Sequence, residues 1–208
     1  MQARGLLIVV SGPSGAGKGT ICKELLRTRQ EVGISVSVTT RQPRAGEVNG
    51  VNYFFKTREE FQEMIARDEL LEYAEVYGNY YGTPKHFVVD QISSGRDILL
   101  EIDIQGAMQI RQKYTEGVFV FIIPPSMAEL RNRIIKRGSE TPDSLATRVS
   151  SAFEEIQFIN KYDYFIVNDT VDAAVGQLGS IIQAEKCRVI ASSIDEVIQE
   201  FKEGLHHA

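Results

Sequence analysis

The chain has 208 residues, a length that suits one globular domain or a core that carries small inserted subdomains. Its 43% hydrophobic residues can form a substantial core, and a net charge of -5 argues against a general binder of nucleic acid or anionic membranes. No apolar run approaches a membrane-spanning length and no signal peptide precedes the first apolar run, so we expect a cytoplasmic protein with no membrane or nucleic-acid partner.

Short apolar or β-branched runs recur along the chain and predict strands. They lie at residues 6–10, 34–38, 98–102, 118–123 and 164–167. Three of these runs are nearly continuous in apolar residues, as expected of strands that helices cover on both faces. The helix-like segments between them predict an α/β fold in which a mostly parallel central sheet is flanked by helices.

Helical periodicity is clearest over residues 18–27, 171–182 and 194–201. Thr57 and Glu60 have the spacing of a capping box at the start of a further helix. Cys22 and Cys187 lie in helix-like stretches without C-x-x-C spacing, so we expect two free thiols in a reducing compartment. Residues 39–60 and 73–85 are rich in Gly, Tyr and Arg, and we expect them to form excursions from the sheet core.

The segment SGPSGAGKGT, residues 11–20, matches the phosphate-loop pattern G-x-x-x-x-G-K at Gly12, Gly17 and Lys18. A predicted strand precedes it and a predicted helix follows, which is the context that such a loop requires. Glycines let backbone N–H groups converge on phosphate oxygens, and the helix adds its positive N-terminal end. Lys18 would reach the β- and γ-phosphates of a nucleoside triphosphate. The alternative, a glycine-rich turn with an incidental lysine, is disfavoured by the flanking elements.

Gly19 stands where the phosphate-loop pattern usually has a hydroxyl that binds Mg²⁺. Thr20 comes one residue later and could substitute for that hydroxyl. Alternatively, Mg²⁺ is carried by the ATP phosphates and water, and Glu101 or Asp103 could orient the water. The sequence leaves both arrangements open.

Two groups of arginines could hold further phosphate oxygens. Arg41 and Arg44 lie in a turn-prone stretch, and a pair of guanidinium groups suits a dianionic phosphate. Arg133 and Arg137 are four residues apart, so they share a helix face if the helix continues past them, and Arg148 follows after a loop. Solvated basic surfaces are the alternative interpretation of both groups.

Three separated segments allow a more specific interpretation of these arginines: SVSVTTRQPRAGEVNGVNYFF, EYAEVYGNYYGT and EIDIQGA. In this order they resemble the guanylate kinase family, and the similarity runs from residue 6 to about residue 169. The resemblance implies transfer of the γ-phosphoryl group of ATP to GMP, and to dGMP as well, with Mg²⁺ as cofactor. It also implies a phosphate-loop core (1–34, 86–125 and 150–208), an inserted GMP-binding subdomain (35–85) and a mobile lid (126–149).

The resemblance assigns roles to individual positions of this chain. The residues that would bind guanine are Ser37, Glu72, Thr83 and Asp103. Those that would hold the GMP phosphate are Arg41, Arg44, Tyr53 and Tyr81. Those that would bind ATP are Gly12, Pro13, Ser14, Gly15, Ala16, Gly17, Lys18, Gly19, Thr20 and Asn168. Those that would compensate charge during transfer are Lys18, Arg133, Arg137 and Arg148.

The assignment of Glu72 is chemically sensible. Guanine offers adjacent N1–H and 2-amino donors that one carboxylate can accept together, whereas adenine presents an N1 lone pair that repels it. Sites that require such donors reject analogues lacking them by roughly 10⁴-fold or more. We expect no general base, because the GMP phosphate is already an anionic nucleophile.

Two other functions remain open from the sequence. The string GAGKGT also resembles the phosphate loop of adenylate kinases, so another nucleoside monophosphate kinase is the enzymatic alternative. A non-catalytic guanylate-kinase-like module that binds partner peptides is the other, although Lys18 and the lid arginines disfavour it. The stretch from Cys187 onward could pack on the core or mediate self-association into a homo-oligomer.

Overall fold

The computed structural model describes residues 4–136, 142–189, 194, 198–199 and 201–203. A central sheet of five parallel strands has the order β2-β7-β1-β8-β9. Its strands are β1 (Leu7–Ser11), β2 (Val32–Ile34), β7 (Asp97–Glu101), β8 (Val118–Ile123) and β9 (Tyr164–Val167). The prediction of a mostly parallel sheet in an α/β fold is confirmed.

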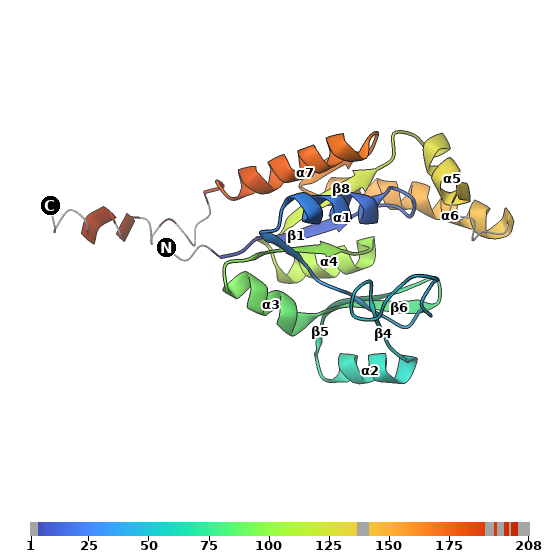
Figure 1. The fold of residues 1–208 in the computed structure, drawn as a ribbon, viewed down its shortest axis with the longest axis horizontal. Coiled ribbons are helices and arrows are strands. Elements are labelled where there is room, and N and C mark those ends of the chain that lie inside the picture. Colours follow the sequence, from blue (N-terminus) through green and yellow to red (C-terminus); the bar gives the residue numbers. More distant parts are fainter. Residues whose placement is uncertain (1–3, 137–141, 190–193, 195–197, 200, 204–208) are drawn as a thin grey trace.

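Helices cover both faces of the central sheet (Figure 1). On one face, α1 (Lys18–Thr28) and α7 (Val171–Glu185) pack against Ile8 and Val10 of β1. On the other face, α3 (Lys85–Ser93) and α4 (Ile104–Lys113) pack against Leu7 and Val9. Successive residues of β1 therefore point into two different cores, which explains why its sequence is apolar without alternation.

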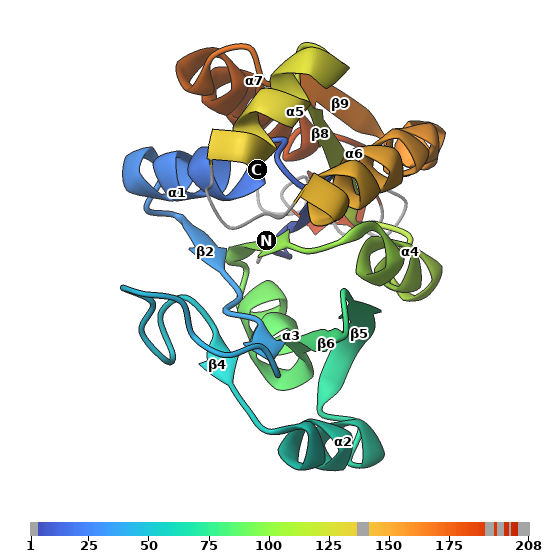
Figure 2. The same cartoon turned by 90° about the vertical axis from the view of Figure 1, so that its right-hand side faces the viewer.

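A second, four-stranded sheet with the order β4-β3-β6-β5 is inserted between β2 and β7 of the chain. Its elements are β3 (Val38–Thr39), β4 (Phe54–Phe55), α2 (Arg58–Ala66), β5 (Leu70–Val76) and β6 (Asn79–Pro84). Phe61 of α2 is fully buried and stacks on Tyr80 with ring centroids 5.4 Å apart. Helix α2 lies at the end of this unit farthest from the central sheet (Figure 2).

The expected strand at residues 34–38 is wrong as a single element. Strand β2 ends at Ile34 and β3 begins at Val38, because the chain leaves the central sheet here and enters the second one. The capping box is confirmed: Glu60 N donates to Thr57 Oγ1 at 3.1 Å, and Thr57 N donates to Glu60 Oε2 at 2.7 Å. The β5–β6 hairpin, with left-handed backbone at Tyr77 and Gly78, was not predicted.

The C-terminal third adds α5 (Met127–Lys136), α6 (Pro142–Ile156) and a short 3₁₀ helix, η1 (Gln157–Lys161). Pro142 is the first residue of α6, a position where its missing N–H costs nothing. Helix α6 therefore begins within the stretch where a loop was expected before Arg148, and it continues past the expected subdomain boundary at residue 149. Half of the expected last helix, residues 194–201, lies outside the described residues.

Within the described part of the chain, the longest apolar helices fall short of what a membrane crossing needs. Both cysteines are free, with Cys22 buried and Cys187 exposed, as expected.

Candidate active site

A cavity of about 390 Å³ lies where the carboxyl ends of β1 and β7 face the second sheet. Residues expected to bind different ligands line it together. From the phosphate loop and α6 come Gly12, Ser14, Gly15, Gly17, Lys18, Gly19 and Arg148. From the opposite side come Ser37, Arg41, Arg44, Tyr53, Glu72, Tyr81 and Asp103. The expected residues outside the lining are Pro13, Ala16, Thr20, Thr83, Arg133 and Asn168.

The phosphate loop turns sharply between β1 and α1. Gly12 has a φ of 141°, and a Cβ there would lie 2.1 Å from the carbonyl oxygen of Ile122, so the position requires glycine. The Lys18 ammonium folds back over the loop and donates to the carbonyls of Gly12 (2.6 Å) and Pro13 (3.3 Å). Gly17 is the N-cap of α1 and supplies no side-chain oxygen to the first turn. This arrangement suits a helix N-terminus that takes an external anion.

The Glu101 carboxylate lies beside Gly19. A Cβ at Gly19 would lie 3.3 Å from Glu101 Oε1 and 3.4 Å from Oε2, and Glu101 lines the cavity. Thr20 is exposed and lines a separate hollow with Lys23 and Val171. Among the described residues there is no group of three or more His, Cys, Asp or Glu side chains that could hold a metal ion unaided. Glu101, and not Thr20, is therefore the side chain that faces the cavity beside the first turn of α1.

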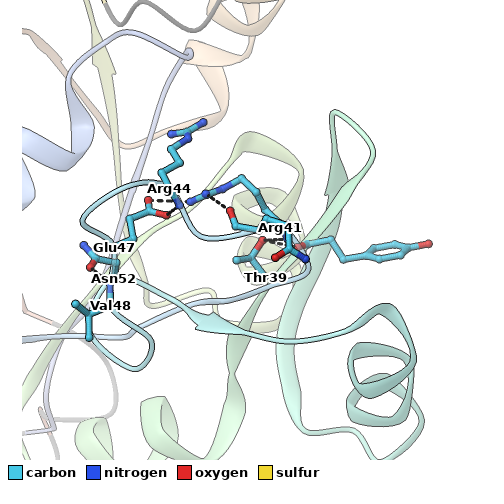
Figure 3. Close-up of polar contacts among 8 residues, drawn as sticks. Thr39, Arg41, Arg44, Glu47, Val48 and Asn52 are labelled. Carbon is cyan, nitrogen blue, oxygen red and sulfur yellow. Dashed lines mark hydrogen bonds and ion pairs between the residues drawn. The ribbon is translucent and has the colours of Figure 1, made fainter.

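Glu47 organises the arginine loop, and the sequence analysis did not find it. Its Oε1 accepts from Arg41 NH2 at 2.9 Å and its Oε2 accepts from the Arg44 backbone N–H at 2.7 Å (Figure 3). The pairing lowers the pKa of the Glu47 carboxyl, chiefly through the Arg41 hydrogen bond, and raises the pKa of Arg41. The Arg41 guanidinium also lies 5.3 Å from the centroid of the Tyr53 ring. The position of Glu47, three residues after Arg44, is the sequence signal that could have suggested this contact.

Glu72 is a carboxylate with almost no exposure to solvent. Its side chain comes from β5, is 2% exposed, and accepts a hydrogen bond of 2.6 Å from the Thr83 hydroxyl on β6. The pKa of Glu72 is raised to about 7, chiefly by burial and also by the nearby Asp103, while the Thr83 hydrogen bond opposes the shift. A buried carboxylate at the wall of a cavity is ready to accept hydrogen-bond donors from a ligand.

Asp103 and Ser37 complete this side of the cavity. Asp103 is the N-cap of α4, where its Oδ1 accepts from Gln105 N at 2.8 Å and Gly106 N at 3.1 Å. Ser37 lies between β2 and β3, and its carbonyl accepts from Phe54 N at 2.9 Å. Both residues are held by backbone hydrogen bonds, so their positions are fixed without a ligand.

Arg133 and Asn168 form a chain of hydrogen bonds to the phosphate loop at Ala16. Asn168 Nδ2 donates to the Ala16 carbonyl at 2.7 Å, and Arg133 donates to the Asn168 carbonyl at 3.0 Å and to Glu129 at 2.8 Å. Arg148 lines the cavity, with its guanidinium 5.3 Å from the centre of the Tyr77 ring. Arg137 lies outside the described residues. Of the two expected lid arginines that the structure describes, Arg148 reaches the cavity wall and Arg133 does not.

Glu155 of α6 lines the cavity, and its role could not be found from the sequence. Its carboxylate accepts from the backbone N–H of Ser14 in the phosphate loop. Burial raises the pKa of Glu155, and Lys18 nearby opposes the shift. No spacing in the sequence indicates this contact, because α6 and the loop are far apart along the chain.

Comparisons with known proteins agree on one family. The sequence model described as "Guanylate kinase" matches residues 4–185. The guanylate kinase of Clostridium perfringens strain SM101 is 59% identical over 204 residues, which cover 98% of this chain and 94% of that protein. That of Clostridioides difficile strain 630 is 53% identical over 202 residues, or 97% and 98% of the two chains. The crystal structure of guanylate kinase from Anaplasma phagocytophilum aligns with a TM-score of 0.77 at 36% identity, covering 90% of this chain and 89% of that one.

Proposed function

The chain belongs to the guanylate kinase family, and on that premise we propose how its cavity transfers the γ-phosphoryl group of ATP to GMP, giving ADP and GDP. One observation carries the proposal: the phosphate loop and the Glu72–Arg41 side of the second sheet line a single cavity. ATP and GMP bound at these two walls would present their phosphates to each other. In-line transfer then needs alignment and charge compensation more than covalent help.

The ATP phosphates would bind the backbone N–H groups of the loop and the first turn of α1. Lys18 would exchange its contacts with the Gly12 and Pro13 carbonyls for phosphate oxygens. Arg148 and the two other lid arginines would add positive charge, and closure of residues 126–149 over the cavity would exclude water. Asn168 and Arg133 would keep the loop in shape through the Ala16 carbonyl.

Mg²⁺ bound with ATP would neutralise part of the phosphate charge. The residues present fit this cofactor, because the Glu101 carboxylate lies where a side chain at Gly19 would point. Carboxylates that accept from metal-bound water are a common second layer around Mg²⁺. We propose Glu101 as that acceptor and Thr20 as a residue with no part in the metal site.

GMP would lie against the second sheet. Arg41, Arg44, Tyr53 and Tyr81 would hold its phosphate, and Glu72, Asp103, Ser37 and Thr83 would surround its base. The same pocket would accept dGMP, because none of these contacts is assigned to the 2′-hydroxyl. Apart from Asp103 at the edge of the core, these residues would belong to the inserted GMP-binding subdomain (35–85).

A coupled assay of ADP release tests the proposal. GMP added to protein, ATP and Mg²⁺ should start ADP release, and the Lys18→Ala variant should show almost none. A protein that binds GMP without releasing ADP would instead be a non-catalytic binding module. Lys23→Ala, on the exposed face of α1, is the control for a change of charge near the loop.

A further inference from the structure

Glu72 and Gly106 are in closer contact than any side chain at position 106 would allow. Gly106 lies in the first turn of α4, beneath the Glu72 carboxylate. A Cβ at Gly106 would lie 2.2 Å from Glu72 Oε2 and 2.9 Å from Cδ. Non-bonded carbon and oxygen atoms do not approach this closely. An alanine here and the present position of the carboxylate therefore exclude each other.

The backbone of α4 gives no reason for glycine at position 106. The residue is helical, and it is absent from the described glycines that have positive φ. Alanine stabilises a helix relative to glycine, so the helix alone would favour a side chain here. The contact with Glu72 is the feature that requires its absence.

If a methyl group were added at position 106, the carboxylate would move and the helix would stay. Helix α4 is fixed by the Asp103 cap and by the buried side chains of Ile104, Ala107 and Ile110. The Glu72 carboxylate is the end of a flexible side chain that already lines the cavity. Its displacement would break the 2.6 Å hydrogen bond from Thr83 and change where the two oxygens point.

We infer that Gly106 is a specificity-determining positioning residue, because its missing side chain lets the Glu72 carboxylate lie where both oxygens can meet guanine. Gly106 touches neither nucleotide and acts through Glu72 alone. The inference rests on the proposed function, since it concerns the base of the acceptor nucleotide. It predicts that a methyl group at position 106 changes base selection without loss of the fold.

The test compares GMP with inosine monophosphate as acceptors for the full-length chain. Inosine monophosphate keeps the N1–H donor and lacks the 2-amino group, so the ratio of the two kcat/KM values reports how well the carboxylate is placed. For Gly106→Ala we expect this ratio to fall roughly tenfold, mainly through a higher KM for GMP, with the KM for ATP unchanged. Gly176→Ala in α7 is the matched control, because a Cβ there meets nothing within 4 Å.

The same substitution is repeated in the Glu72→Gln background. If Gly106 acts through the carboxylate, Gly106→Ala should then alter the ratio by less than about twofold. An equal fall in both backgrounds, an unchanged ratio in the single variant, or a wild-type protein that does not distinguish the two acceptors would overturn the inference. A Gly106→Ala variant that shows no folded state in a thermal melt would also overturn the inference, since the helix itself would then need the glycine. Absence of any GMP-dependent ADP release in the wild type would instead refute the proposed function.

Discussion

Glu47 Oε1 lies 2.9 Å from Arg41 NH2, and both side chains are largely buried, with exposures of 18% and 13%. The other oxygen of Glu47 accepts from the Arg44 backbone N–H, so one carboxylate fixes the side chain of one arginine and the main chain of the other. The ends of the Arg41–Arg44 loop are therefore held in place before a phosphate binds. Such preorganisation reduces the entropy lost on binding.

Glu47→Gln should weaken GMP binding while leaving ATP binding intact. Glutamine keeps the shape of the side chain but removes the charge that holds Arg41, and a hydrogen bond to a charged partner contributes about 1.5 to 3 kcal/mol. We expect the KM for GMP to rise by roughly tenfold. Glu63→Gln is the control, because Glu63 pairs with Arg67 on the exposed surface of α2. Equal KM values for GMP in the two variants would contradict the role of Glu47.

Glu72→Gln should make the free protein more stable at alkaline pH. The pKa of Glu72 is about 7 when folded, against 4.5 for an unperturbed carboxyl. Between these two pH values the folded protein binds a proton that the unfolded chain releases, so the free energy of unfolding falls as pH rises through the window. We expect the variant to exceed the wild type by up to roughly 3 kcal/mol at pH 8 and by little near pH 4.5. Urea unfolding at both pH values measures this difference. A variant that is less stable than the wild type at pH 8 would refute the claim that a buried charge on Glu72 destabilises the fold.

The ionisation of Glu72 should also change the KM for GMP. Only the ionised Glu72 can accept both guanine donors, so the KM for GMP should rise roughly tenfold between pH 8 and pH 6. The GMP phosphate also titrates near pH 6, and the comparison with Glu72→Gln separates the two effects. A pH profile for KM that is identical in wild type and variant would show that Glu72 does not titrate in this range.

Much of the fold could be predicted from periodicity and local chemistry. The phosphate loop follows from glycines between an apolar run and a helical repeat, and the start of α2 follows from Thr57 and Glu60. The prediction of one strand over residues 34–38 was wrong, because β-branched residues favour a strand without showing which sheet each end joins. The β5–β6 hairpin was missed because its tyrosines and glycines hide the alternation of buried and exposed residues in Leu70–Val76.

The site was less predictable than the fold. Arg41 and Glu72 could be assigned only through the family resemblance, since an isolated arginine or glutamate is more often a surface residue. Glu155 meets Ser14 only in three dimensions, and no local pattern could indicate it. The contact between Gly106 and Glu72 likewise depends on how α4 packs against β5.

Glu101→Gln should raise the Mg²⁺ concentration needed for half-maximal activity, whereas Thr20→Val should not. Glu101 faces the space beside Gly19, and Thr20 lines a different hollow. Loss of a charged acceptor for metal-bound water should raise the requirement roughly tenfold. A Mg²⁺ titration at fixed ATP measures it. The reverse result would assign the metal contact to the Thr20 hydroxyl.

Arg148→Ala should lower kcat by more than about tenfold, since a charge-assisted contact made in the transition state contributes more than about 1.4 kcal/mol. The stability of the protein should change little, because the Arg148 guanidinium stacks on the partly exposed Tyr77 ring at the cavity. Arg131→Ala, at an exposed position of α5, removes the same charge outside the cavity. A fall in kcat of less than about threefold for Arg148→Ala would end its proposed role in transfer.

The most direct test of the central claim is an acceptor panel with the wild-type protein at one ATP concentration. GMP, AMP, dTMP and UMP are compared by kcat/KM for ADP release. Recognition of the guanine N1–H and 2-amino donors by Glu72 predicts that GMP exceeds AMP by roughly 10⁴-fold and that dTMP and UMP are weaker still. Comparable activity with AMP or a pyrimidine nucleotide would contradict the claim that this cavity selects guanine.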